Sequence, residues 1–164
     1  MVAAVQVGRK TVTRRRLPLN LSIQQEPSRY HYRGMVEGRA VFQDMQTQTM
    51  LPAVLCPFGQ RGDVFQVQEY PALRLQVVSI RAEQVHCLTE ADALAEGIRS
   101  LEQDGQLHWG GVEPDPAGGF RWYSSPIAAF QGLLNSIYPE AWVRNEWVWV
   151  VEFRSAFRPN KDCL

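Results

Sequence analysis

The sequence predicts an α+β fold in one domain, a mixed β-barrel of about five or six strands with two or three helices outside it. Three stretches with strand patterns, which begin at Val64, Leu73 and Glu146, carry this prediction. Two helix starts, at Thr89 and Pro126, separate these strands. Small sheets of this kind commonly close into a barrel, and the helices then pack on its outer surface.

Length and composition are those of a single soluble domain. The chain has 164 residues, of which 45% are hydrophobic and 21% are charged. No apolar run is long enough to span a bilayer, and the N-terminus lacks a signal-peptide pattern. The cysteines are odd in number and far apart, without zinc-ligand spacing: Cys56, Cys87 and Cys163. We therefore expect a cytoplasmic protein that binds no membrane, metal or other cofactor and has no disulfide framework.

The charges balance overall but are unevenly distributed. There are 17 basic and 17 acidic residues, so the net charge does not indicate a nucleic-acid-binding protein. Cations gather near the N-terminus, whereas acidic residues crowd between Glu83 and Asp115. A local basic face of this kind suits a nucleotide or a single strand better than a long duplex.

The N-terminal segment is the part of the chain richest in reactive and charged side chains. Met1 to Val7 predicts a short helix that runs into a turn at Gly8. Residues 8–15 then contain four cations and two hydroxyls. Arginines in such a stretch can bind phosphate or carboxylate through their rigid fork of donors, although a solvated basic loop is the alternative.

A hairpin is predicted next. Residues 30–32 and 39–42 flank a turn rich in glycine between Gly34 and Gly38. In a strand, Tyr30 and Tyr32 share one face. These two aromatic rings either pack in the core or stack on a base.

Residues 56–63 contain residues typical of turns and lead into a strand over 64–68. Glu69 ends this strand near the expected mouth of a cavity. Glu69 either has a functional role or is a solvated carboxylate at the end of the strand. Residues 73–85 predict a long strand. Its apolar phase changes near Val77, which indicates a β-bulge.

A short helix over residues 91–96 follows. Thr89 is placed to cap it with Asp92 three residues on, and Gly97 ends it. Glu96 lies at the C-terminal end of this helix, where the helix dipole disfavours an anion. Water or a cation such as Lys10 must balance its charge.

Residues 99–125 are rich in Gly, Pro and Asp and predict a variable insertion without regular structure. Three aromatic residues lie within it: Trp109, Trp122 and Tyr123. They either cover the site or stack on a base, or they anchor the loop on the barrel.

The C-terminal part predicts a helix and a strand. Ser125 caps a helix over residues 127–137, whose apolar stripe packs on the barrel. Residues 146–154 are apolar on both faces, which is typical of a central, buried strand. Residues 158–164 form a polar tail.

Four blocks in order carry a resemblance to a known family: residues 1–15, 56–69, 88–98 and 145–154. The chain resembles the ASCH superfamily of PUA-like β-barrels, in the subgroup common in phages and prophages. The resemblance implies a single domain over residues 1–157. Relatives usually carry a strand before the position of Met1, so we expect an open sheet edge that is covered or paired with a second copy, and hence a possible homodimer.

The resemblance also implies a site. The family includes small bacterial amidohydrolases that deacetylate N(4)-acetylcytidine with a lysine, a threonine nucleophile three residues later and a glutamate on a short helix. These positions correspond to Lys10, Thr13 and Glu96. We expect the substrate to be bound by Arg14, Arg15, Glu69, Trp109 and Trp122.

The expected chemistry is nucleophilic. A threonine hydroxyl needs a base to take its proton, which a neutral lysine amine can do, and a glutamate can protonate the leaving amine. Two alternatives are open. Such a fold also serves as a non-catalytic module that binds RNA or a modified base, or as a ribonuclease. In each case the expected partner is a nucleoside or single-stranded RNA.

Overall fold

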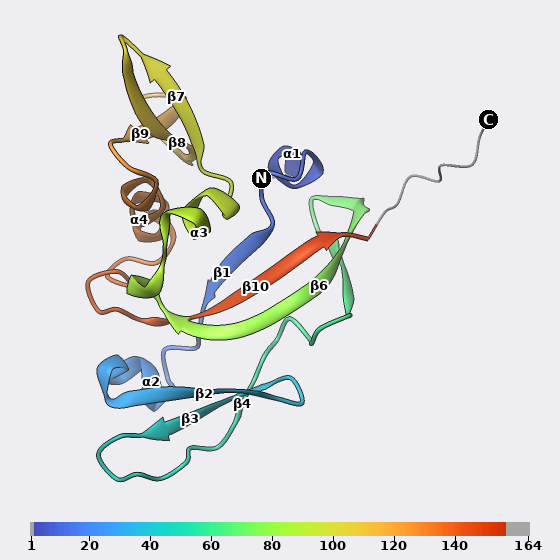
Figure 1. Ribbon diagram of the computed structural model, residues 1–164, viewed down its shortest axis with the longest axis vertical. Helices are drawn as coiled ribbons and strands as arrows, with labels where there is room; N and C mark the ends of the chain where they lie inside the picture. The colour runs from blue at the N-terminus through green and yellow to red at the C-terminus, as the bar shows by residue number, and fades with distance from the viewer. Residues whose placement is uncertain (1, 157–164) are drawn as a thin grey trace, which may run out of the picture.

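Figure 1 shows the computed structural model of the protein, which describes residues 2–156. The fold is α+β and consists mostly of strands. Its centre is a curled four-stranded sheet in the order β1-β10-β6-β5. These strands span Val12–Arg16 (β1), Trp147–Ser155 (β10), Tyr70–Gln84 (β6) and Val64–Val67 (β5).

Two three-stranded sheets flank the curled sheet on opposite sides (Figure 1). One consists of β2 (Tyr30–Val36), β3 (Arg39–Asp44) and β4 (Val54–Leu55). The other consists of β7 (Arg99–Gln103), β8 (Gln106–Pro114) and β9 (Phe120–Tyr123). The described strands thus form three sheets, where we expected one barrel of five or six strands.

All pairings between the described strands are antiparallel, so the expected mixed sheet is not found among them. Short connections favour this result, because parallel neighbours need a crossover of a dozen or more residues. The edges of the curled sheet are β1 and β5. Pairing of either edge with a second copy stays a prediction.

Four α-helices complete the described part of the chain: α1 (Val2–Gln6), α2 (Ser22–Gln25), α3 (Glu90–Ala95) and α4 (Pro126–Ile137). Two 3-10 turns precede β2 and α3, at Pro27–Arg29 and Val85–Cys87. No helix within residues 2–156 has the length and apolarity needed to cross a membrane. Met1, Cys163 and the predicted tail at 158–164 lie outside the described residues.

Strand β10 separates two hydrophobic cores, which confirms the prediction of a central, buried strand. Val148 and Val150 pack with α3 and α4 on one face. Trp147, Trp149 and Val151 pack with the β2–β3 hairpin on the other face. Since successive side chains of a strand point to opposite faces, the apolar run on both faces requires this position between two layers.

The predicted β-bulge is present in β6. The pairing with β10 runs from Glu152 opposite Ser79 to Phe153 opposite Val77, which leaves Val78 as the extra residue. A bulge increases the local twist and bends the strand. It therefore contributes to the curl of the sheet.

The predicted hairpin is confirmed as β2 and β3, with a tighter turn than expected. The turn residues Glu37 and Gly38 have φ of 48° and 73°, which fits the two-residue turn that suits antiparallel strands. Gly34 lies inside β2, next to a register shift. Tyr30 and Tyr32 both pack in the core with Phe42, so these rings pack and are not free to stack on a base.

Residues 99–125 are the main difference from the sequence prediction, because they form strands β7, β8 and β9. Asp104 and Gly105 make the β7–β8 turn with φ of 52° and 74°. Glycine, proline and aspartate are enriched in tight turns as well as in loops. Their abundance therefore concealed three short strands, of which β8 and β9 pack on α4.

The helix ends follow the predicted chemistry. Thr89 and Asp92 form a reciprocal capping box at the start of α3. Ser125 accepts a hydrogen bond from the Ala128 amide at 3.1 Å and caps α4. Of the predicted α4 stripe, Phe130 is buried whereas Ile137 at the helix end is 49% exposed.

Candidate functional site

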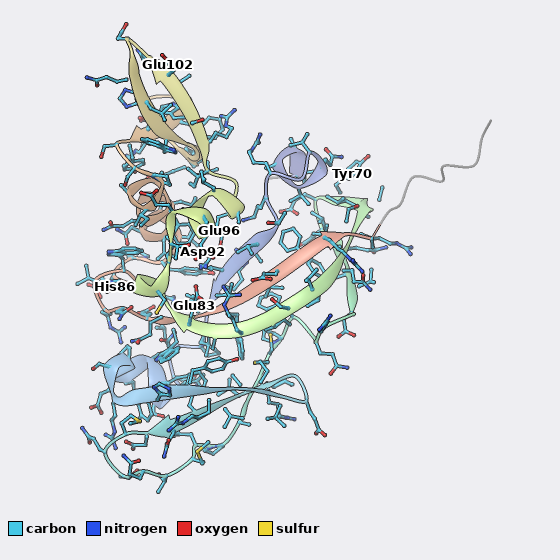
Figure 2. The ribbon with its side chains drawn as sticks, viewed as in Figure 1. Tyr70, Glu83, His86, Asp92, Glu96 and Glu102 are labelled. Atoms are coloured by element: carbon cyan, nitrogen blue, oxygen red, sulfur yellow. The ribbon has the colours of Figure 1, made fainter. Side chains whose placement is uncertain are left out.

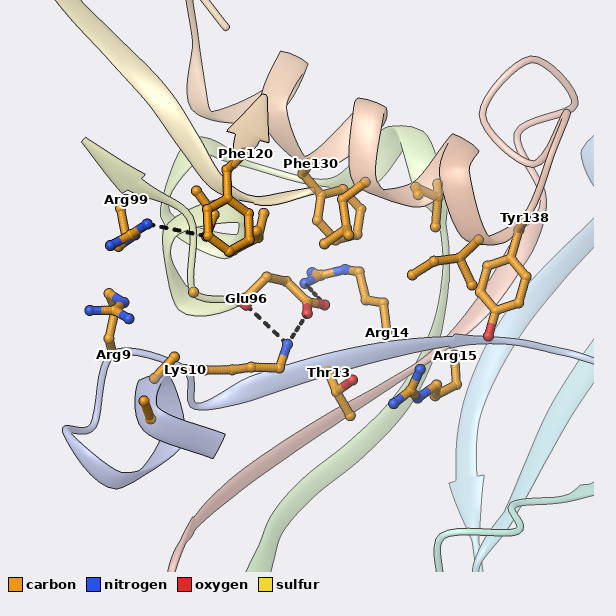
Figure 3. Close-up of a pocket in the computed structure, with 18 residues that line it drawn as sticks. Arg9, Lys10, Thr13, Arg14, Arg15, Glu96, Arg99, Phe120, Phe130 and Tyr138 are labelled. Carbon is orange, nitrogen blue, oxygen red and sulfur yellow. Dashed lines mark hydrogen bonds and ion pairs between the residues drawn. The ribbon is translucent and has the colours of Figure 1, made fainter. Parts of the chain in front are cut away.

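A cavity of about 360 Å³ opens where the outer edge of β1 meets the C-terminal end of α3 and one face of α4 (Figure 3). Arg9, Lys10 and residues 13–15 supply its floor, and Glu96 and Gly97 supply one wall. Gly97 has φ of 102° and lies against Lys10, where a Cβ atom would approach the Lys10 Cβ to 3.4 Å. The Thr11 amide donates to the Ala95 carbonyl at 2.9 Å, which joins β1 to α3.

Lys10 and Glu96 meet inside this cavity. The Lys10 ammonium donates to Glu96 Oε2 at 2.5 Å and to the Glu96 carbonyl at 3.0 Å. The two residues are only 8% and 5% exposed. The lysine thus balances the carboxylate at the end of α3, and it also satisfies a carbonyl that the helix leaves free.

Arg14 holds the other oxygen of Glu96. Its Nη1 lies 3.4 Å from Glu96 Oε1, and its Nη2 lies 2.7 Å from Glu83 Oε1 and 3.1 Å from Asp92 Oδ1. Figure 2 shows these three acids between β6 and α3. Because the Arg14 side chain is fully buried and contacts three carboxylates, it positions Glu96. From the sequence we expected Arg14 to bind the substrate. Arg14 lines the cavity, but its guanidinium is occupied by these carboxylates and is not free for a ligand.

The acids around Arg14 reach the surface through Arg81, which contacts Glu83 Oε2 at 3.1 Å and Glu152 Oε1 at 2.6 Å. Burial raises the pKa of Asp92, but the hydrogen bonds from Thr89 and the Arg14 charge outweigh it. The pKa of Asp92 therefore lies below its ordinary value. A continuous chain of ion pairs thus fixes the inner wall of the cavity.

Thr13 lies in the middle of β1, opposite Val151 of β10, and lines the same cavity. It is half-buried, and its hydroxyl has no hydrogen-bond partner within residues 2–156. In Figure 3 the Lys10 amine lies beside Glu96 on one side of the β1 ribbon, whereas the Thr13 side chain extends to the other side, as does Arg15. The hydroxyl is therefore free to contact a bound molecule.

The main chain of β1 adds polar groups at this edge. Thr11 accepts from the Phe153 amide, and Leu17 donates to the Trp147 carbonyl, so alternate residues between them bond to β10. The amide and carbonyl of Arg14 consequently point away from β10. An edge strand of this kind offers a donor and an acceptor to a planar ligand.

The mouth of the cavity is basic and aromatic. Arg9, Arg15 and Arg99 line it together with Phe120 and Tyr138. The Arg99 guanidinium lies 5.8 Å from the Phe120 ring and 5.7 Å from the Trp122 ring. Sequence reasoning missed Arg99 and Phe120, because both lie in the segment expected to be a loop. The sequence offered one indication of a strand start here, which is that Phe120 directly follows two glycines typical of a turn.

Four other aromatic or acidic candidates do not line the cavity. Glu69 is exposed in the turn between β5 and β6. Trp109 packs against the core, and the Trp122 ring lies 5.7 Å from the Arg99 guanidinium without lining the cavity. The Tyr123 hydroxyl donates to Glu113 Oε2, and burial together with this carboxylate raises the pKa of Tyr123. Phe120, on the opposite face of β9 from Tyr123, is the aromatic that reaches the cavity.

Within residues 2–156, no three His, Cys, Asp or Glu side chains are grouped as metal ligands would be. Comparisons of the chain with models of protein families, with curated proteins and with solved structures find no significant match. The geometry of the cavity therefore carries the functional argument alone.

Proposed function

We propose that the protein is an ASCH-type amidohydrolase that removes an acyl group from the exocyclic amine of a modified pyrimidine nucleoside, such as N(4)-acetylcytidine. The observation that carries this proposal is the convergence of Lys10, Thr13 and Glu96 on one cavity. The curled sheet with α3 and α4 on one face is compatible with a PUA-like barrel.

The first step needs a base beside Thr13. A protonated lysine cannot serve, but the 2.5 Å contact lets one proton pass from Lys10 Nζ to Glu96 Oε2. Away from water an ion pair loses much of its advantage over the neutral amine and acid. The neutral Lys10 amine then takes the Thr13 proton as the Thr13 oxygen attacks the acyl carbon.

The second step needs an acid for the departing amine. Glu96, protonated by the first transfer, donates its proton to the nitrogen as the carbon–nitrogen bond breaks. Lys10 is then an ammonium again and Glu96 a carboxylate, so the pair returns to its starting charges. Water afterwards hydrolyses the acyl ester on Thr13. A well-placed acid or base contributes about 10²–10⁴-fold to such a rate.

One observation favours the alternative of a non-catalytic binding module. The Lys10 amine donates to both the carboxylate and the carbonyl of Glu96, an arrangement that suits a permanent ammonium. A pocket with fixed charges of this kind binds a nucleobase without reacting with it.

The two functions separate in one experiment. Purified protein is assayed for release of acetate from N(4)-acetylcytidine and for cleavage of short single-stranded RNA, and binding of cytidine is measured by calorimetry. Hydrolysis of the acylated nucleoside alone supports the amidohydrolase. Binding of cytidine without any turnover establishes the binding module, and RNA cleavage establishes a nuclease.

A further inference from the structure

The charges that line the cavity are strongly unequal, although the whole chain is neutral. Five cations line it, at positions 9, 10, 14, 15 and 99, and among the described lining residues Glu96 is the single acid. The complete sequence has a net charge of zero. The excess of positive charge is therefore a property of this cavity and not of the protein as a whole.

The five cations fall into an inner and an outer group. Lys10 and Arg14 are buried and paired with carboxylates, as described above. Arg9, Arg15 and Arg99 make no ion pair with any acid of residues 2–156. The outer three guanidiniums thus keep their donors available at the mouth.

Contacts within the protein order the Arg99 side chain. Its guanidinium lies against Phe120 and Trp122, and its Nη2 donates to the Gly111 carbonyl at 3.5 Å. Gly111 leaves the room for this, because a Cβ atom there would lie 2.5 Å from Arg99 Nε. A side chain that is already ordered loses less entropy when it binds.

Arg9 and Arg99 lie at the same end of the cavity in Figure 3, on facing sides of the opening, whereas Arg15 lies at the other end near Tyr138. Arg9 comes from the turn before β1, and Arg99 is the first residue of β7. Two facing guanidiniums form a clamp that fits the oxygens of one phosphate, because each can donate two parallel hydrogen bonds.

We propose that the substrate carries a phosphate group, which Arg9 and Arg99 bind while the base enters toward Lys10, Thr13 and Glu96. The substrate is then a nucleotide and not a free nucleoside. This inference rests on the proposed function for the location of the base. The phosphate belongs either to a mononucleotide or to an RNA strand, since both present the same oxygens.

The test is a binding measurement with ligands that cannot be hydrolysed. Cytidine, cytidine 5′-monophosphate and a cytidine trinucleotide without a terminal phosphate are titrated into the full chain by calorimetry. We expect the monophosphate or the trinucleotide to bind about tenfold or more tightly than cytidine, with an advantage that shrinks as salt increases. A tighter monophosphate indicates a mononucleotide, and a tighter trinucleotide indicates a strand.

Variants assign the effect to the clamp. Arg9→Ala and Arg99→Gln should remove most of the advantage that the phosphate-bearing ligands have over cytidine. Arg61→Ala is the matched control, since Arg61 is also exposed and unpaired within the described chain but does not line the cavity. Equal binding of all ligands, no binding of any, or an equal loss in Arg61→Ala overturns the inference. Because none of the ligands carries an acyl group, the result is independent of whether the protein hydrolyses N(4)-acetylcytidine.

Discussion

Glu96 is shared between two buried cations: Lys10 contacts Oε2 at 2.5 Å and Arg14 contacts Oε1 at 3.4 Å. The lysine and the glutamate are 86 positions apart in the chain. This arrangement links the stability of the fold to the chemistry of the cavity. Glu96 has two cationic partners, whereas Lys10 has one anionic partner.

This difference predicts that Glu96→Gln loses more stability than Lys10→Met. Glu96→Gln leaves the buried ammonium of Lys10 without a counterion, and breaking a buried ion pair costs about 3–5 kcal/mol. Lys10→Met costs less, because Arg14 still neutralises Glu96. Urea unfolding of both variants measures the two free energies. A larger loss for Lys10→Met would show that Arg14 does not support the carboxylate.

Neighbouring arginines on β1 should behave in opposite ways. Arg14→Met leaves Glu83, Asp92 and Glu96 without their shared cation, and we expect a loss of about 3–5 kcal/mol in the free energy of unfolding. Arg15→Met should stay within about 0.5 kcal/mol of the parent, since Arg15 makes no ion pair in the described chain. Similar losses for both variants in urea unfolding would contradict this distinction.

Stability should decline in acid partly through Asp44. The Arg29 guanidinium, with Nη2 at 2.7 Å, holds the pKa of Asp44 well below its ordinary value of 3.8. A carboxyl group with a lowered pKa in the folded state stabilises the fold above that ordinary value, and this contribution disappears as the pH falls further.

The measurement is urea unfolding over a series of pH values from neutral into the acid range. Asp44→Asn should lose less stability below pH 3.8 than the parent does. Asp104→Asn is the control, because Asp104 is an exposed turn residue without an ion pair in the described chain, and asparagine tolerates its φ of 52°. Identical acid slopes for Asp44→Asn and the parent would refute the assignment.

Gly132 of α4 gives a prediction that helix propensity alone would reverse. Alanine normally stabilises a helix interior by about 1 kcal/mol relative to glycine. Here a Cβ atom would collide with the Tyr123 hydroxyl and the Glu113 carboxylate. We therefore expect Gly132→Ala to lower the free energy of unfolding by about 1–3 kcal/mol. A stabilised variant in thermal unfolding would show that β8 and β9 do not pack tightly on α4.

Much of the fold could be predicted where apolar pattern and capping residues agree. The alternation in β10, the change of phase at Val78 and the Thr89 cap each have a local cause, so the sequence displays them directly. Strands β7 to β9 were not predicted, because glycine, proline and aspartate dominate the composition of residues 99–125 and are typical of loops as well as of turns. Each of these strands nevertheless pairs with its neighbour in sequence.

The candidate site was predicted unevenly. Lys10, Thr13 and Glu96 came from matching a family's motif, and the cavity brings them together. Glu83 and Asp92 belonged to a run of acids that resembles a solvated surface. Their role as counterions of a buried arginine depends on the meeting of β1, β6 and α3, which no local spacing reveals.

The central claim is that the Thr13 hydroxyl is the nucleophile, and the most direct test compares two threonines of the same segment. Thr13→Val keeps the shape of the side chain and removes the hydroxyl. Thr11→Val makes the same change at an exposed position that does not line the cavity.

The measurement is the rate of acetate release from N(4)-acetylcytidine, together with calorimetric binding of cytidine. We expect the parent and Thr11→Val to turn over at similar rates. Thr13→Val should lose turnover by at least about 10²-fold while binding cytidine nearly as tightly. Full hydrolytic activity in Thr13→Val, or a parent protein that binds cytidine but releases no acetate, would contradict the amidohydrolase.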